Sequence, residues 1–145
     1  MPETLKIEGK MNFHLISPRK VILDAVADKV LLPTPNGPRM ILKNAAPIFL
    51  KIAVGSLWRK EDGKKPLCYI VSEGCAEIRR NICSVLAWAV PFDEIDRTYF
   101  KEMFSQTEKE EQKMTSDYGK KQIQSYKEFI TYVLNVPSHL DTPNF

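Results

Sequence analysis

The hydrophobic pattern changes once along this 145-residue chain, at Pro91, and this change is the strongest constraint on the fold. Before Pro91, apolar residues form short runs rich in Val, Ile and Leu, separated by Pro, Gly and Asn. After Pro91, apolar residues recur at every third or fourth position, and no Gly or Pro occurs before Gly119. Short apolar runs between turns are typical of β-strands, whereas the longer period is typical of amphipathic helices. The sequence therefore predicts a β domain followed by helices.

The first part predicts a β-sandwich over about residues 11–90, because turn signals recur with no helical pattern between them. The expected strands are residues 13–16, 21–23, 27–32, 39–42, 48–53, 56–59, 67–71, 75–78 and 83–89. The turn at residues 33–37 contains an Asn36-Gly37 step, which readily adopts positive φ. A second, polar turn is expected at Arg79-Arg80-Asn81. Residues 1–10 are expected to form an N-terminal extension.

The second part predicts an α-helical hairpin over residues 91–136. The first helix should begin at Asp93, where acidic residues suit the positive end of a helix dipole. Ser116-Asp117 is a capping signal for the second helix, and Pro137 ends it. About three residues separate the helices, so they should be antiparallel. The expected apolar stripes are Phe92, Ile95, Tyr99 and Met103 in the first helix, and Tyr118, Gln122, Tyr126, Phe129, Ile130 and Val133 in the second. Residues 137–145 should form a flexible tail.

Charge and hydropathy exclude several classes of protein. The net charge is +3, which is too small for the dense basic face of a nucleic-acid binder. Residues 1–92 hold 14 basic and 8 acidic side chains, whereas residues 93–136 hold 7 and 9, so the two parts should have different surfaces. No apolar run reaches the roughly 18 residues of a membrane span. The first ten residues lack the features of a secretory signal, which favours a cytosolic compartment.

The residues that most often carry chemistry show no catalytic or metal-binding spacing. Cys68, Cys75 and Cys83 match no common zinc pattern, and neither His14 nor His139 lies near them in the sequence. Phosphate-binding glycine motifs are absent as well. We therefore expect no catalytic residue, no metal and no cofactor. An enzyme that uses Cys75 or Cys83 as a thiolate nucleophile is an alternative, which alkylation kinetics would reveal.

Several segments, in their order and spacing, resemble the epsilon subunit of rotary F-type ATP synthases over residues 12 to about 136. Three departures from the family pattern lie in turns: Asn36-Gly37-Pro38-Arg39-Met40 replaces Glu-Gly-Glu-Leu/Met-Gly, Asn44-Ala45 replaces Gly-His, and Glu73 replaces one Gly of a Ser-Gly-Gly step. The resembling segments are Phe13-His14-Leu15-Ile16-Ser17-Pro18, Ala27-Asp28-Lys29-Val30-Leu31-Leu32-Pro33, Tyr69-Ile70-Val71-Ser72-Glu73-Gly74-Cys75-Ala76-Glu77-Ile78 and Asn81-Ile82-Cys83-Ser84-Val85-Leu86-Ala87.

The resemblance implies a non-catalytic rotor subunit that couples rotation of the membrane ring to the catalytic head. The implied partners are the gamma subunit, the ring of c subunits and the catalytic beta subunits. The implied location is peripheral, on the cytoplasmic side of the inner, energy-transducing membrane. The implied ring-facing turns hold Asn36, Gly37, Asn44 and Ala45. In the hairpin, Lys120, Lys121 and Lys127 would meet an acidic segment of the beta subunit and restrain ATP hydrolysis.

The resemblance also bears on nucleotide binding. Some relatives bind ATP through an Ile/Leu-Asp-x-x-Arg-Ala stretch, and the matching residues here run from Ile95 to Phe100. Tyr99 stands where Arg is required, and Phe100 stands where Ala is required, so we expect no nucleotide site. A stand-alone β-sandwich adaptor that binds proteins through its hairpin is the alternative function, and co-purification with gamma would distinguish the two.

Overall fold

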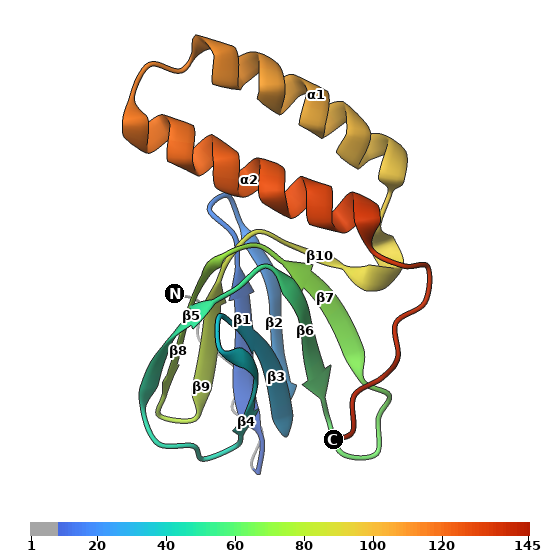
Figure 1. The fold of residues 1–145 in the computed structure, drawn as a ribbon. Coiled ribbons are helices and arrows are strands. Elements are labelled where there is room, and N and C mark those ends of the chain that lie inside the picture. The colour runs from blue at the N-terminus through green and yellow to red at the C-terminus, as the bar shows by residue number, and fades with distance from the viewer. Residues whose placement is uncertain (1–8) are drawn as a thin grey trace.

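The structure is a computed structural model that describes residues 9–145, so most of the expected extension over residues 1–10 lies outside the described residues. Ten strands are followed by a 3-10 turn and two α-helices (Figure 1). The bounds are β1 (Met11–Ile16), β2 (Val21–Ala27), β3 (Lys29–Thr34), β4 (Gly37–Leu42), β5 (Ile48–Ile52), β6 (Gly55–Lys60), β7 (Leu67–Val71), β8 (Gly74–Arg79), β9 (Ile82–Leu86), β10 (Ala89–Pro91), η1 (Phe92–Glu94), α1 (Arg97–Lys113) and α2 (Asp117–Asn135). This confirms the predicted fold class of a β-sandwich followed by a helical hairpin.

The strands form two five-stranded sheets that pack face to face (Figure 1). Sheet A has the order β2-β1-β9-β8-β5, and sheet B has the order β10-β7-β6-β3-β4. All neighbouring strands are antiparallel except β1 and β9, which are parallel. Alternate residues of both sheets face inward and form the main core. Its fully buried members include Phe13, Leu15, Val30, Leu32, Ile52, Leu57, Val71, Ile78 and Val85.

The conformation of the turns explains how they accommodate residues that depart from the pattern of the resembling family. Asn44, where the family has Gly, has a φ of 63°, and Asn is among the residues that tolerate this conformation. Gly37 has a φ of 109°, which side chains rarely adopt. Glu73 is exposed, so a side chain is tolerated there. The neighbouring Gly74 must remain small, because a Cβ would overlap the carbonyl oxygen of Leu86.

The structure corrects three predicted boundaries. The strand expected over residues 27–32 begins only at Lys29, because Ala27 ends β2 and Asp28 forms the turn between the two strands. The strand expected over residues 83–89 is two strands, because at Ala87 and Trp88 the chain crosses from β9 in sheet A to β10 in sheet B. The first helix begins at Arg97 rather than Asp93, because Ile95 has extended dihedral angles and separates η1 from α1. The Asp96 carboxylate then accepts a hydrogen bond from the Tyr99 N–H at 3.2 Å and caps α1.

The predicted helical stripes are partly wrong. Tyr99 is 51% exposed, and its neighbour Phe100 is buried instead, because α1 faces α2 and barely reaches the sandwich. In α2, Tyr118 is 74% exposed and Gln122 is also exposed, whereas Ile123 is buried. The second helix begins where expected, with the Ser116 hydroxyl accepting a hydrogen bond from the Gly119 N–H at 3.0 Å.

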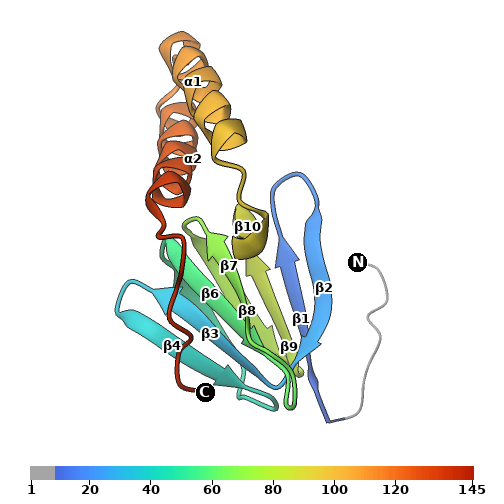
Figure 2. The same ribbon diagram turned by 90° about the vertical axis from the view of Figure 1, so that its right-hand side faces the viewer.

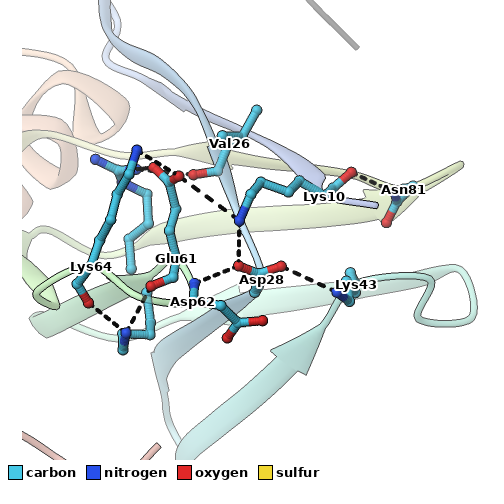
Figure 3. Close-up of polar contacts among 10 residues, drawn as sticks. Lys10, Val26, Asp28, Lys43, Glu61, Asp62, Lys64 and Asn81 are labelled. Carbon is cyan, nitrogen blue, oxygen red and sulfur yellow. Dashed lines mark hydrogen bonds and ion pairs between the residues drawn. The ribbon is translucent and has the colours of Figure 1, made fainter. Parts of the chain in front are cut away.

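A polar network joins the loops at one end of the sandwich (Figure 3). Asp28, between β2 and β3, is 4% exposed and accepts hydrogen bonds from Lys10 Nζ at 2.7 Å, the Asp62 N–H at 2.6 Å and Lys43 Nζ at 3.2 Å. The bond from Lys10, together with that from Asp62, lowers the pKa of Asp28 to about 2. Asn81 accepts a bond from the Asn44 N–H at 2.7 Å and donates one to the Lys10 carbonyl at 2.9 Å. The network therefore fixes four loops and the residue before β1 to one another.

Within residues 9–145, no helix combines the length and the hydropathy that crossing a bilayer requires.

Candidate functional site at the hinge of the hairpin

The chain crosses from one sheet of the sandwich to the other at Trp88, three residues before the sandwich ends at Pro91. The Trp88 N–H donates to the buried Ser72 hydroxyl at 2.8 Å, and the Ser72 N–H donates to the Trp88 carbonyl at 2.8 Å. This reciprocal pair holds the crossing between the two sheets. The Trp88 indole then projects toward the hairpin, where its ring centre lies 4.8 Å from that of Tyr126 on α2. The guanidinium of Arg19 lies 5.8 Å from the Trp88 ring centre, within reach of a cation–π interaction.

The hairpin rests on the sandwich through a second, smaller apolar cluster. Phe129, Ile130 and Val133 of α2 are buried together with Ile70 of β7. Phe100 is the one fully buried apolar residue of α1, and its ring lies edge-on to Phe129 with 6.2 Å between ring centres. Figure 1 shows the resulting arrangement: α2 lies next to the sandwich, and α1 lies on the far side of α2. The hairpin is therefore attached mainly through one helix.

Arg97 ties the two ends of the hairpin together. It lies in the first turn of α1, and its guanidinium donates to the carbonyl oxygens of Leu134 at 2.6 Å and Val136 at 2.7 Å. Those carbonyls belong to the last turn of α2, where backbone acceptors lack helical partners and a positive charge is favourable. From the sequence, Arg97 was assigned no role in the hairpin. The expected helix start at Asp93 placed Arg97 beyond the first turn, so no local signal indicated its partners at the end of α2.

The three lysines expected to meet an acidic partner do not share one environment. Lys120 and Lys121 are exposed and line a shallow groove with Glu111, Gln112 and Gln124. Lys127 points toward α1, and its side chain is only 17% exposed. Its Nζ atom lies 3.4 Å from Glu111, 3.8 Å from Glu108 and 5.2 Å from the ring centre of Phe104. In this arrangement Lys127 is occupied within the hairpin, and Lys120 and Lys121 are the accessible pair.

The two expected ring-facing turns lie at opposite ends of one edge strand. Asn36 and Gly37 precede or begin β4, whereas Asn44 and Ala45 follow it. Gly37 and Leu42 are the two ends of the six-residue strand β4, which spans about 17 Å. Asn44 belongs to the polar network around Asp28 and Asn81, and Gly37 lies at the opposite end. One partner surface could contact both turns only by covering the length of β4.

A cleft of about 550 Å³ opens between the sandwich and the hairpin. Arg19 and Lys20 line it on the sandwich side, and Glu94, Asp96 and Tyr99 line it on the hairpin side. Phe100 fills the position where the ATP-binding relatives require Ala, and Arg97 is engaged with α2. The expectation that the chain binds no nucleotide therefore remains a prediction, and this geometry supports it.

The cysteines do not gather into a reactive site. Burial raises the pKa of the Cys83 thiol to about 12, and burial together with Asp93 raises that of Cys68 to about 12. Few molecules would carry a thiolate at either position at neutral pH. Cys75 is half-buried on β8. Within the described part of the chain, no three His, Cys, Asp or Glu residues are grouped so that they could hold a metal ion.

Comparisons with known proteins agree with this architecture. The chain is 35% identical over 88 residues to the ATP synthase epsilon chain of Sinorhizobium fredii, and 36% identical over 85 residues to that of Symbiobacterium thermophilum. These alignments cover 60% and 58% of this chain, and 66% and 60% of the two relatives. The chain thus spans just under two thirds of the length of the curated relatives that it matches.

Two solved structures share the fold across most of the chain. One is the Euglena gracilis mitochondrial ATP synthase, with a TM-score of 0.58, 20% identity and coverage of 90% of this chain and 86% of that chain. The other is the central stalk and c-ring of the Tetrahymena thermophila mitochondrial ATP synthase, with a TM-score of 0.50, 14% identity and coverage of 90% and 100%. The family model for the β-sandwich domain of the ATP synthase delta/epsilon chain matches residues 10–91, which is more than half of the chain. This protein therefore belongs to the ATP synthase delta/epsilon chain family.

Proposed function

We propose that this chain is a non-catalytic subunit of the rotor of an F-type ATP synthase. The observation that carries the proposal is the combination of a family sandwich at residues 10–91 with a helical hairpin attached mainly through one helix. In the proposed role, the sandwich binds the gamma subunit and the ring of c subunits and transmits torque between them. The protein is peripheral, on the cytoplasmic side of the inner, energy-transducing membrane. Catalysis takes place on the beta subunits.

The sandwich has properties that suit a part under mechanical load. Its two sheets enclose one continuous core, and the Asp28 network joins four loops and the residue before β1 at one end. Close-packed protein interiors resist deformation, so a force applied at one end of the sandwich is transmitted to the other end. The Asn36–Gly37 and Asn44–Ala45 turns would both face the ring, which would then cover the length of β4 between them.

The hairpin would act as a brake on ATP hydrolysis. Lys120 and Lys121 are exposed and could meet an acidic segment of a beta subunit without prior rearrangement. Lys127 would first have to leave Glu108 and Glu111. Opening of the hairpin and contact with the catalytic head are therefore coupled in this proposal, since the third lysine becomes available only when the helices separate.

Two measurements test the proposal. The tagged full-length chain should co-purify with gamma and the catalytic head from its own organism, and a stand-alone adaptor would not. Truncation after Phe92 should raise ATP hydrolysis by the assembled enzyme and leave gamma binding intact. Charge reversal at Lys120, Lys121 and Lys127 together should reproduce part of that increase at low salt and lose its effect at high salt. If truncation leaves hydrolysis unchanged over a range of ATP concentrations, the hairpin is a structural brace.

A further inference from the structure

The residues after α2 turn back along the sandwich instead of continuing the helix. Val136 has extended dihedral angles, with φ of −66° and ψ of 135°, and Pro137 cannot extend a helix because it lacks an N–H. Residues 137–145 form neither helix nor strand, and they run down along sheet B (Figure 2). We call residues 137–145 the tail.

The tail is seated on the outer side of sheet B through Leu140. On β6 and β7, Leu57 and Tyr69 belong to the main core. Side chains alternate along a strand, so Trp58 and Cys68, which are opposite each other in the register, face outward. Leu140 lines a hollow of about 150 Å³ together with these two residues, and Trp58 is only 8% exposed although it points away from the main core. Side-chain packing at this hollow therefore holds the tail on the sheet.

The tail begins at the contact that closes the hairpin. Val136 is 6% exposed within the hairpin cluster, and its carbonyl oxygen accepts the hydrogen bond from Arg97 at the start of α1. Four residue steps join Val136 to Leu140, and even a fully extended chain of this length spans at most about 14 Å. The helices have 17 and 19 residues, so each is about 25 Å long or more. Separation of α2 from α1 by a helix length would exceed the reach of this link.

We propose that the tail is a latch on the hairpin, so that α2 separates from α1 and the sandwich only after Leu140 has left Trp58 and Cys68. The tail and α2 are joined by a short link and pack on neighbouring positions of one sheet, so each raises the effective concentration of the other at its site. The tail belongs to neither sheet, so its release leaves the strand pairing intact. The latch is a property of the isolated chain and goes beyond the proposed function, which it does not require.

Cys68 provides a chemical probe of the latch. Burial and the nearby Asp93 raise the pKa of its thiol to about 12, so it should react slowly with iodoacetamide while Leu140 is seated. Cys83 is buried in the main core, and Cys75→Ser removes the remaining thiol.

The experiment compares two substitutions in the full-length Cys75→Ser chain. Leu140→Ser removes the packing at the hollow without adding a charge, and Asn144→Ser changes an exposed position of the same tail and is the matched control. Two rates are measured for each chain: alkylation of Cys68, and hydrogen exchange of amides in α2 and β1. Exchange in β1 reports whether the sandwich itself remains intact.

In Leu140→Ser, alkylation of Cys68 should be roughly three- to tenfold faster, because a partly buried Leu contributes part of the free energy of full burial. Amides in the middle of α2 should exchange faster by a similar factor, because α2 opens only from the state in which the tail has left. Asn144→Ser should match its background, and β1 should keep its rates in both variants.

Three results would overturn the proposal. Unchanged alkylation in Leu140→Ser would show that this side chain does not hold the tail. Faster alkylation with unchanged exchange in α2 would show that the tail leaves without loosening the hairpin. Faster exchange in β1 as well would show that Leu140 supports the whole fold rather than a latch.

Discussion

Arg97 should decide how firmly the hairpin stays closed at the end that joins the sandwich. Replacing it with Ala removes two hydrogen bonds, at 2.6 and 2.7 Å, from a charged donor to the last carbonyls of α2. Bonds that involve a charged group contribute about 1.5–3 kcal/mol each in protected sites, and a cation at an exposed helix end contributes about 0.3–1 kcal/mol. Arg97 is exposed, so we expect about 1–2 kcal/mol in total, which changes the closed-to-open ratio by roughly 5- to 30-fold.

Hydrogen exchange reports the loss of these contacts, because the last turn of α2 frays more often once Arg97 no longer holds its carbonyls. In Arg97→Ala, these amides should exchange roughly 5- to 30-fold faster, while amides of β1 and β9 in the sandwich keep their wild-type rates. Arg97→Lys retains the positive charge but loses the planar guanidinium, so its exchange rate should lie between those of the wild type and Arg97→Ala. Lys101→Ala removes an exposed cation one turn further along α1 and is the matched control.

Two results would refute this reasoning. Exchange in Arg97→Ala that matches Lys101→Ala would show that the two carbonyl contacts do not hold the hairpin closed. Faster exchange throughout the sandwich as well would show that Arg97 supports the whole fold rather than the hairpin alone.

If the open hairpin is the form that restrains hydrolysis, Arg97→Ala should also lower ATP hydrolysis by the assembled enzyme.

Three further predictions concern stability. Asp28→Asn should lower the free energy of unfolding by about 1–2 kcal/mol at pH 7. The reason is that folding lowers the pKa of the Asp28 carboxyl from 3.8 to about 2, and solvent screening reduces the effect of this shift. This contribution is present above about pH 4 and is lost as the pH falls toward 2, so urea unfolding curves of mutant and wild type should converge there. Gly74→Ala should destabilise the sandwich by about 2 kcal/mol or more in the same assay, because its Cβ overlaps the Leu86 carbonyl, whereas Glu73→Ala should change little. Lys127→Glu should lower the melting temperature by a few degrees at low salt and less at high salt, because Glu108 and Glu111 lose their cation; equal losses at both salt concentrations would contradict it.

The strands were predictable where local residues determine the turn. Gly37 and Asn81 both lie in predicted turns, and both adopt positive φ in the structure. The crossing at Trp88 was missed because residues 83–89 form one apolar run, and an apolar run does not reveal which sheet each residue joins. The start of α1 was missed because the acidic residues that suggested a helix at Asp93 form a 3-10 turn instead.

The surroundings of the hairpin residues were less predictable than the hairpin itself. The sequence places Lys127 and Lys120 seven positions apart on nearly the same helical face, yet Lys127 is held against α1 and Lys120 is exposed. Which face of α2 meets α1 and which meets the sandwich depends on contacts between segments far apart in the chain. The partners of Arg97 were unpredictable for the same reason, because Leu134 and Val136 lie nearly 40 residues away in the sequence.

The distribution of apolar contacts explains how one chain can be rigid in one part and movable in another. The main core lies wholly between the two sheets, so separation of the hairpin would leave it intact. The hairpin cluster includes Ile70, Phe129, Ile130 and Val133, and burying one such side chain contributes about 1.5–3 kcal/mol before ordering entropy is subtracted. The ordering entropy of the hairpin opposes this burial, so a partner that prefers the released state can shift the balance between docked and released hairpin. Because α1 is held mainly by α2, Arg97 and Lys127 lie at the contacts whose loss would separate the helices from each other before the sandwich itself is disturbed.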